Sequence, residues 1–197
     1  MRLRDLLAHA RYIHEVDPAC NSVFEAMFMY PMNRALLAHG SAHRLYKKGH
    51  TTLARWISQR ARKKTGIEIH PGASIGKFLF IDHGAGVVIG ETTWIGDYVT
   101  IYHGVTLGGT GNESAKQRHP LICNHVMIGA GATVLGPVIV GKHAKIGANT
   151  VVVHDMPPYS TAIGPKARLI EKTGPDGKKH LVDNCRKEIL DKQRRSR

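Results

Sequence analysis

The stretch that decides the fold opens with Ile67-Glu-Ile-His-Pro-Gly-Ala-Ser-Ile-Gly76 and runs to about Ile170. A branched aliphatic residue returns every six positions over most of its length, and glycine or another small residue often follows it. The series consists of Ile69, Ile75, Ile81, then Ile89, Ile95, Ile101, Leu107, then Ile122, Ile128, Val134, Val140, Ile146 and Val152. A period of six fits neither an amphipathic helix nor a lone two-sided strand, and it is typical of a repeat protein.

Short strands joined by tight turns explain this period. The aliphatic residue of each strand points inward, and the glycines permit the backbone conformations of a sharp corner. Three such hexapeptides close one triangular coil, and stacked coils bury a continuous aliphatic column while their backbones pair. The sequence therefore predicts a parallel β-helix.

Residues 1–66 carry apolar side chains at helical spacing and predict an N-terminal helical region. Ser22 and Glu25 have the spacing of a capping box, which predicts a helix that begins there. In the last helix we expect Leu53, Trp56 and Ile57 to be buried. These helices are expected to cover the first coil, whose open edge would otherwise invite strand addition. The fold class is accordingly α+β, a helical cap followed by a β-helix.

The domain organisation follows from where the repeat holds and where it stops. We assign residues 1–66 to the helical region, 67–170 to the β-helix and 171–197 to a basic tail with the composition of a disordered segment. Between Leu107 and Ile122 the spacing is fifteen residues, so one coil carries an excursion at about 109–120. Such interruptions of a solenoid usually hold function or contact a neighbouring subunit.

Composition limits the classes of function. The formal charge is +13, from 28 basic and 15 acidic residues, yet we find no nucleic-acid module and no basic stripe interleaved with aromatics. Most of these charges are expected to be solvated, with a few reserved for a phosphorylated small molecule. Cys20, Cys123 and Cys185 form neither a disulfide framework nor a metal-ligand pattern. No membrane span and no signal peptide is evident, so a cytoplasmic location is expected.

Two histidines stand at irregularities of the repeat. A two-residue offset after Ile81 brings Asp82-His83-Gly84 to a corner, and the excursion ends in Arg118-His119-Pro120. This position makes His83 and His119 better functional candidates than the histidines in regular corners, which are His70, His103, His125 and His143.

The chain resembles the serine O-acetyltransferase family. The resemblance rests on Ile81-Asp-His-Gly-Ala-Gly-Val-Val-Ile-Gly-Glu91, Val105-Thr-Leu-Gly-Gly-Thr-Gly111 and Arg118-His-Pro120, and it extends from Val16 to Ile170. Hexapeptide repeats alone would indicate only acyltransferases with many different acceptors. The Asp-His, Gly-Gly-Thr-Gly and Arg-His-Pro elements in this order are narrower evidence. The resemblance implies a left-handed β-helix.

The resemblance also implies transfer of acetyl from acetyl-CoA to the hydroxyl of L-serine, giving O-acetyl-L-serine for cysteine biosynthesis. By similarity His83 is the general base, and the acidic Glu68 before Ile-His-Pro orients it. The acceptor-binding residues implied in the same way are Asp17 and Asp82 for the ammonium, Arg118 for the carboxylate and His119 for the amino acid or the developing oxyanion.

Acetyl-CoA is the co-substrate implied by the resemblance, with no separate cofactor and no metal. Family similarity points to Gly109, Ala130 and Ala148 along a groove between two β-helices, with Lys145 near the phosphates. The resemblance implies a homotrimer with sites at its interfaces, and cysteine is expected to compete with serine. A complex with cysteine synthase is not expected, because the chain ends Lys192-Gln-Arg-Arg-Ser-Arg197 without a terminal isoleucine.

Two alternatives remain open at this point. The acceptor could be homoserine or a sugar instead of serine. A non-catalytic scaffold, or a metal-binding relative of the carbonic anhydrases that uses His83, His103 and His125, would also fit a hexapeptide repeat. The Asp82-His83 and Arg118-His119 pairs argue against the latter.

Overall fold

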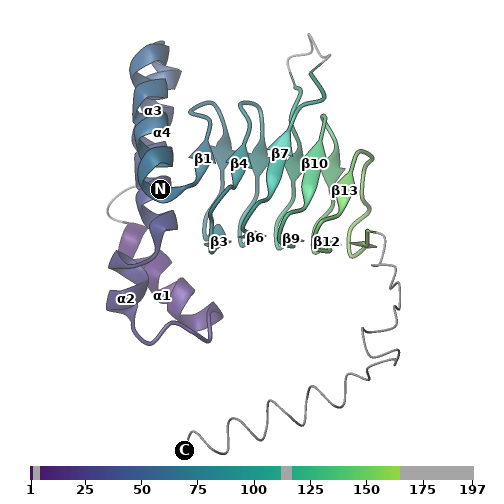
Figure 1. Cartoon of the computed structure of the whole chain (residues 1–197), viewed down its shortest axis with the longest axis horizontal. Helices are drawn as coiled ribbons and strands as arrows, with labels where there is room; N and C mark the ends of the chain where they lie inside the picture. Colours follow the sequence, from purple (N-terminus) through teal and green to yellow (C-terminus); the bar gives the residue numbers. More distant parts are fainter. Residues whose placement is uncertain (2–4, 112–116, 165–197) are drawn as a thin grey trace, which may run out of the picture. The chain divides into compact units, whose positions relative to one another are not determined.

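The structure is a computed structural model that describes residue 1, residues 5–111 and residues 117–164. Helices come first in this part of the chain, followed by short strands stacked in coils (Figure 1). The helices are α1 (Leu6–Val16), α2 (Val23–Phe28), α3 (Pro31–Lys47) and α4 (Thr51–Thr65). Among the described residues no helix is long and apolar enough to cross a membrane. The tail at 171–197 lies outside the described residues.

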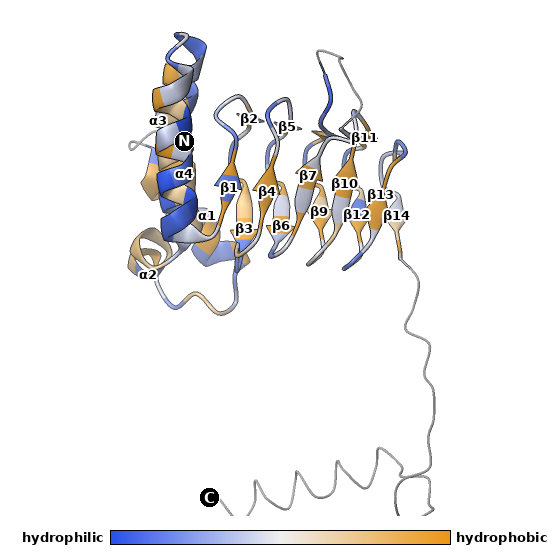
Figure 2. Cartoon of the chain, turned by 45° about the horizontal axis from the view of Figure 1, so that its top comes forward, coloured by the Kyte–Doolittle hydropathy of each residue, from blue (hydrophilic) through white to orange (hydrophobic). Residues whose placement is uncertain are grey.

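The strands form three parallel sheets, which are the three faces of a triangular stack (Figures 1 and 2). Face A contains β1 (Glu68–Ile69), β4 (Val88–Ile89), β7 (Thr106–Gly108), β10 (Thr133–Leu135) and β13 (Val151–Val152). Face B contains β2 (Ser74–Ile75), β5 (Trp94–Ile95), β8 (Leu121–Ile122) and β11 (Ile139–Val140). Face C contains β3 (Phe80–Asp82), β6 (Thr100–Tyr102), β9 (Met127–Ile128), β12 (Lys145–Ile146) and β14 (Thr161–Ala162).

The aliphatic series lies inside this stack, as the period predicted. Val88 pairs with Thr106, and Thr133 pairs with Val151, eighteen residues later in each case. Members of the series are completely buried, among them Ile95, Ile101, Leu107, Ile122 and Ile128. The α+β architecture of a helical cap and a left-handed parallel β-helix of hexapeptide repeats is therefore confirmed.

The three edges of the stack are the corners where the chain passes from one face to the next. The A–B edge consists of residues 70–73, 90–93, 109–120 and 136–138, of which 112–116 are not described. The B–C edge consists of 76–79, 96–99, 123–126, 141–144 and 157–160. The C–A edge consists of 83–87, 103–105, 129–132 and 147–150.

Two coils are longer than eighteen residues, and both extensions fall at an edge. Glu68 pairs with Val88 after twenty residues, and Thr106 pairs with Thr133 after twenty-seven. The excursion accounts for the longer of the two. Face B nevertheless keeps its register across the excursion, because Leu121 of β8 pairs with Trp94 of β5. The extra residues are thus absorbed locally at the edges.

The helical region satisfies the backbone at the open end of the first coil. In the strand ladders, amide groups of one coil donate to carbonyls of the next, as from Glu68 to Val87 and from Val88 to Val105. Several carbonyls of the first coil face the helices instead of a preceding coil. Four of them accept hydrogen bonds from helix side chains: His9 to Leu79, His39 to Ala73, His43 to Pro71 and Ser58 to Ile69. This is the edge protection that the sequence predicted.

Some details of the helices differ from expectation. Ser22 does cap α2, since its hydroxyl accepts a bond from the Glu25 amide at 3.1 Å. The expected burial of Leu53 and Trp56 is wrong, because these side chains are 49% and 59% exposed. Ala54 and Ser58 face inward instead. Small residues are required there because the Ser58 hydroxyl lies 2.6 Å from the Ile69 carbonyl oxygen, which brings α4 close to β1.

Candidate functional site

The Asp82-His83 pair lies where β3 ends and the C–A edge begins. His83 has a φ of 53°, in the left-handed region, which turns the chain sharply after the strand. Its Nε2 atom lies 3.7 Å from Oδ1 of Asp82, and its side chain is 81% exposed. An imidazole this accessible, beside a carboxylate, can exchange a proton with a bound ligand.

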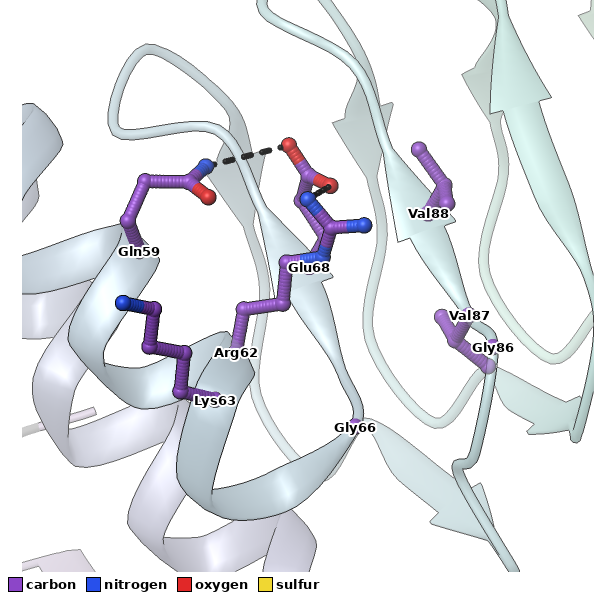
Figure 3. A pocket seen from close by; sticks show the side chains of 8 residues that line it. All are labelled: Gln59, Arg62, Lys63, Gly66, Glu68, Gly86, Val87 and Val88. Carbon is purple, nitrogen blue, oxygen red and sulfur yellow. Dashed lines mark hydrogen bonds and ion pairs between the residues drawn. The ribbon is translucent and has the colours of Figure 1, made fainter.

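Glu68 lies on β1, and its carboxylate is held by side chains of α4. Gln59 donates to it at 3.3 Å and Arg62 lies at 3.2 Å (Figure 3). Arg55 lies at 3.6 Å. A cavity of about 320 Å³ opens beside these groups and is lined further by Lys63 and residues 86–88. Within the described part of the chain the side-chain partners of Glu68 are all on α4, so the structure does not join its carboxylate to His83.

Arg118 lies on the A–B edge and forms an ion pair with Glu91 of the preceding coil. Nη2 of Arg118 lies 2.7 Å from Oε2 of Glu91, and the hydroxyl of Tyr46 on α3 donates to Oε1 at 2.6 Å. These two bonds, that of Tyr46 first, lower the pKa of Glu91 to about 2. Glu91 is therefore ionised at any ordinary pH.

Thr92 fixes the backbone at the end of the excursion. Its hydroxyl oxygen accepts bonds from the amides of Arg118 and His119 at 3.0 and 3.1 Å. The Thr92 amide donates to Nδ1 of His119 at 3.2 Å, so a neutral His119 ring carries its proton on Nε2. Gln117 donates to the carbonyls of Thr92 and His119. His119 is 6% exposed, so these contacts hold its ring in a fixed, buried position.

Gly90 makes room for the His119 ring. A Cβ atom at position 90 would lie 2.0 Å from Cδ2 of His119, well inside van der Waals contact. Any side chain at this position would displace the ring, so glycine is a requirement of the His119 site.

Asp17 ends α1 and is itself hydrogen-bonded. Its Oδ2 accepts a bond from the Tyr30 hydroxyl at 2.5 Å, and its Oδ1 accepts one from the Ala19 amide at 2.9 Å. Burial, followed by the bond to Asp17, raises the pKa of Tyr30. Asp17 therefore stabilises the turn after α1, and the acceptor role that the resemblance implies for it stays a prediction.

The residues suggested for acetyl-CoA divide between two edges. Ala130 and Ala148 are stacked on the C–A edge, where the Asn149 amide donates to the Ala130 carbonyl at 2.8 Å. Lys145 is exposed on β12 of the adjoining face C. Gly109 follows β7 and begins the excursion on the A–B edge. The His83 edge thus holds two of the four residues, and the Arg118 edge holds one.

Most of the site residues accordingly form two groups on different edges of one chain, around His83 and around Arg118, while Asp17, Glu68 and Lys145 lie outside these edges. Sequence reasoning overlooked Tyr46, Glu91 and Thr92 in the second group. A signal existed for Glu91, which precedes Arg118 by 27 residues, the length of the coil that carries the excursion. Tyr46 had no comparable signal because it comes from α3.

The B–C edge carries a ladder of stacked rings that the sequence analysis also missed. Adjacent rings have centroids 4.7 to 5.1 Å apart, and the members are Phe78, Tyr98, His125, His143 and Tyr159. His125 therefore lies on a different edge from His83 and His103, the other histidines of the metal-binding alternative. The described residues contain no group of three or more histidine, cysteine or acidic side chains that could hold a metal.

Comparison with known proteins matches the hexapeptide repeat. The family model for bacterial transferase hexapeptide (six repeats) matches residues 119–154. A serine acetyltransferase of Helicobacter pylori (strain ATCC 700392 / 26695) is 56% identical over 168 residues, which are 85% of this chain and 98% of the relative. This chain belongs to the serine acetyltransferase family. As a member of the serine acetyltransferases it is an acyltransferase.

Solved serine acetyltransferase structures share the fold. The enzyme of Neisseria gonorrhoeae in complex with serine has a TM-score of 0.77 at 42% identity, covering 84% of this chain and 68% of that one. The enzyme of Brucella abortus strain S19 in complex with coenzyme A has a TM-score of 0.77 at 40% identity, covering 87% and 68%. Serine acetyltransferase isoform 3 from Entamoeba histolytica, in complex with cysteine, has a TM-score of 0.80 at 38% identity, covering 86% of this chain and 61% of that one.

Proposed function

We propose that this serine acetyltransferase family member transfers the acetyl group of acetyl-CoA to the hydroxyl of L-serine, giving O-acetyl-L-serine and CoA for cysteine biosynthesis. The observation that carries the proposal is the exposed Asp82-His83 pair in a chain that is 56% identical to a serine acetyltransferase. Acyl transfer between an alcohol and a thioester needs no separate cofactor, so acetyl-CoA is the only other small molecule that we assign.

His83 is the general base in this proposal. It accepts the proton of the serine hydroxyl while that oxygen attacks the thioester carbonyl carbon. The tetrahedral intermediate then collapses, the carbon–sulfur bond breaks, and the CoA thiolate takes the proton from the imidazolium. His119 supports the reaction by donating Nε2–H to the amino acid or to the developing oxyanion.

Glu68 is proposed to orient His83 and to balance the charge of the imidazolium. The side chain of Glu68 is engaged by Gln59 and Arg62 on α4 (Figure 3). A carboxylate has about four acceptor sites, so Glu68 could accept a hydrogen bond from His83 in addition to these contacts. The charge-balancing part of the role needs no direct hydrogen bond, since it acts through space.

The acceptor is proposed to bind through its two charges. Asp17 and Asp82 attract the ammonium group, and Arg118 pairs with the carboxylate through charge-assisted bonds. Cysteine has the same two charges and differs only at the reacting atom. We therefore expect cysteine to compete with serine, which agrees with the cysteine complex of the Entamoeba histolytica relative.

A homotrimer is proposed because the two groups of residues lie on different edges. The C–A edge with His83 would face the A–B edge with Arg118 of a neighbouring chain, which closes the site between them. Acetyl-CoA would lie along the same groove, with Ala130 and Ala148 on one wall, Gly109 on the other and Lys145 near the phosphates. A complex with cysteine synthase is not part of the proposal.

The test is an assay of thiol release from acetyl-CoA with L-serine, L-homoserine and simple sugars as acceptors. We expect L-serine to be preferred. His83→Ala should lower the rate by about two to four orders of magnitude, the usual scale for a lost general base, while acetyl-CoA binding is retained. Faster turnover of homoserine or a sugar would assign a different acceptor, and near-wild-type turnover of His83→Ala would place the base elsewhere.

A further inference from the structure

The Tyr30 hydroxyl and the Ala19 amide together fix the carboxylate of Asp17, one at each oxygen. Oδ2 of Asp17 accepts a hydrogen bond from Tyr30 at 2.5 Å, and Oδ1 accepts one from Ala19 at 2.9 Å. Tyr30 immediately precedes α3 and packs against the buried core, whereas Asp17 follows the last residue of α1. The contact thus ties the end of one helix to the start of another, and it sets the plane in which the Asp17 carboxylate lies.

Tyr30 holds this carboxylate without changing its charge. Burial, followed by the bond to Asp17, raises the pKa of Tyr30, so the phenol stays a neutral donor at any ordinary pH. Among the described residues none forms an ion pair with Asp17, although the chain carries 28 lysines and arginines. A carboxylate has about four acceptor positions, so about two of those of Asp17 remain for a ligand.

Glu91 offers a direct comparison, because it also accepts a tyrosine hydroxyl, that of Tyr46 at 2.6 Å. Its other oxygen is paired with Arg118 at 2.7 Å, which offsets the negative charge of Glu91 toward any third group. Asp17 has a backbone amide in the corresponding place. Asp17 therefore combines a fixed orientation with an uncompensated charge, and these are the two properties that a site for a ligand ammonium requires.

We propose that Tyr30 is a positioning residue that holds Asp17 in the orientation needed for the ammonium group of the acceptor. The inference rests on the proposed function, because it assumes that Asp17 binds this ammonium. Tyr30 acts only through Asp17 and does not touch the acceptor. The helical region thereby contributes to acceptor recognition through Tyr30, in addition to covering the first coil.

The test compares Tyr30→Phe with the wild-type protein. Phenylalanine keeps the ring that packs against the core and removes only the hydroxyl. We expect the KM for L-serine to rise about fivefold, the scale of one lost hydrogen bond. The KM for acetyl-CoA and the kcat should each change by less than about twofold, because the other parts of the site are untouched.

Tyr12→Phe is the matched control for this substitution. Tyr12 is also a half-buried tyrosine of the helical region, and its ring contacts Phe78 and Tyr98 of the B–C edge. Removing its hydroxyl should leave both KM values within about twofold of wild type. An unchanged KM for serine in Tyr30→Phe, or equal rises for both substrates, would overturn the proposal.

A double-mutant cycle separates this inference from the proposed function. Asp17→Asn alone should raise the KM for L-serine about thirtyfold, the scale of a hydrogen bond to a charged group. In that background Tyr30→Phe should have no further effect, because the charge that it positions is gone. If Asp17→Asn leaves the KM for serine unchanged, Asp17 is not the ammonium ligand and that part of the proposed function fails. If Asp17→Asn raises it but Tyr30→Phe has the same effect in both backgrounds, only the positioning role is refuted.

Discussion

His39 is a histidine that the fold keeps neutral. It is 6% exposed between α3 and the first coil, and its Nε2–H donates to the Ala73 carbonyl at 3.1 Å. Burial, followed by the nearby His43, lowers the pKa of His39 to about 3. An unfolded chain would bind a proton at this residue near pH 6.5, well before the folded chain does.

The folded protein should therefore lose stability on acidification through this residue. The contribution of His39 is fully present above about pH 6.5 and decreases as the pH falls toward about 3, by up to about 1.4 kcal/mol per pH unit. Denaturant unfolding at pH 7.5 and 5.5 should show a smaller pH dependence in His39→Gln than in wild type. Equal dependence in the two proteins would mean that His39 is protonated within the folded state.

Sequence reasoning found the candidate site residues that lie where the hexapeptide repeat is interrupted, and it missed those that lie in regular repeats. Asp82, His83, Arg118 and His119 stood out because the offset and the excursion mark them. Glu91 sits in an ordinary corner, and its role appears only when the coils are stacked. The engagement of Glu68 by α4 depends on how a helix packs on β1, which no period in the sequence records.

Each element of the B–C edge contributes one ring to the ladder. Its members have φ values between 57° and 61°, so the corner needs a residue that tolerates the left-handed region, and histidine does so better than most. Tyr98 also contacts Tyr12 of α1 at 5.6 Å, which connects the ladder to the helical region. Burial, His125 and Lys142 lower the pKa of His143, which favours the neutral form of that ring.

Tyr98 is where the ladder can be tested, because its ring stacks on Phe78 and His125 and also contacts Tyr12. Tyr98→Asn keeps a residue that tolerates positive φ but removes the ring. We expect it to lower the free energy of unfolding by about 2 kcal/mol. Tyr98→His, which restores a stacking ring, should cost less than about half of that. If both substitutions cost the same, ring stacking contributes little at this edge.

At the element scale, the repeat was predictable because burial imposes it. An inward aliphatic residue every sixth position leaves few alternatives for the backbone, and the strands follow. The inner face of α4 was not predictable in the same way. Leu53 and Trp56 looked like its core, yet a helix that must approach β1 closely requires Ala54 and Ser58 there instead.

The placement of His83 and Arg118 on different edges has a consequence for the whole assembly. In a trimer, each site would take His83 from one subunit and Arg118 from the next. Subunits with His83→Ala and subunits with Arg118→Ala are each expected to be inactive alone. Mixed by co-unfolding and refolding at equal amounts, they should regain about a quarter of wild-type activity, because random mixing restores that share of interfaces. If both residues of a site came from one chain, mixing would restore nothing.

The excursion between β7 and β8 lengthens one coil by half, yet face B resumes its register on the far side. A change in the length of this segment should therefore leave the packing of the buried aliphatic residues unchanged, because the flanking strands determine that packing. Stability and chemistry therefore depend on different parts of the chain. The sequence of the segment that carries Arg118 and His119 can change while the stacked strands stay the same. A scaffold of this kind can acquire a new acceptor by exchanging one loop, without a new core.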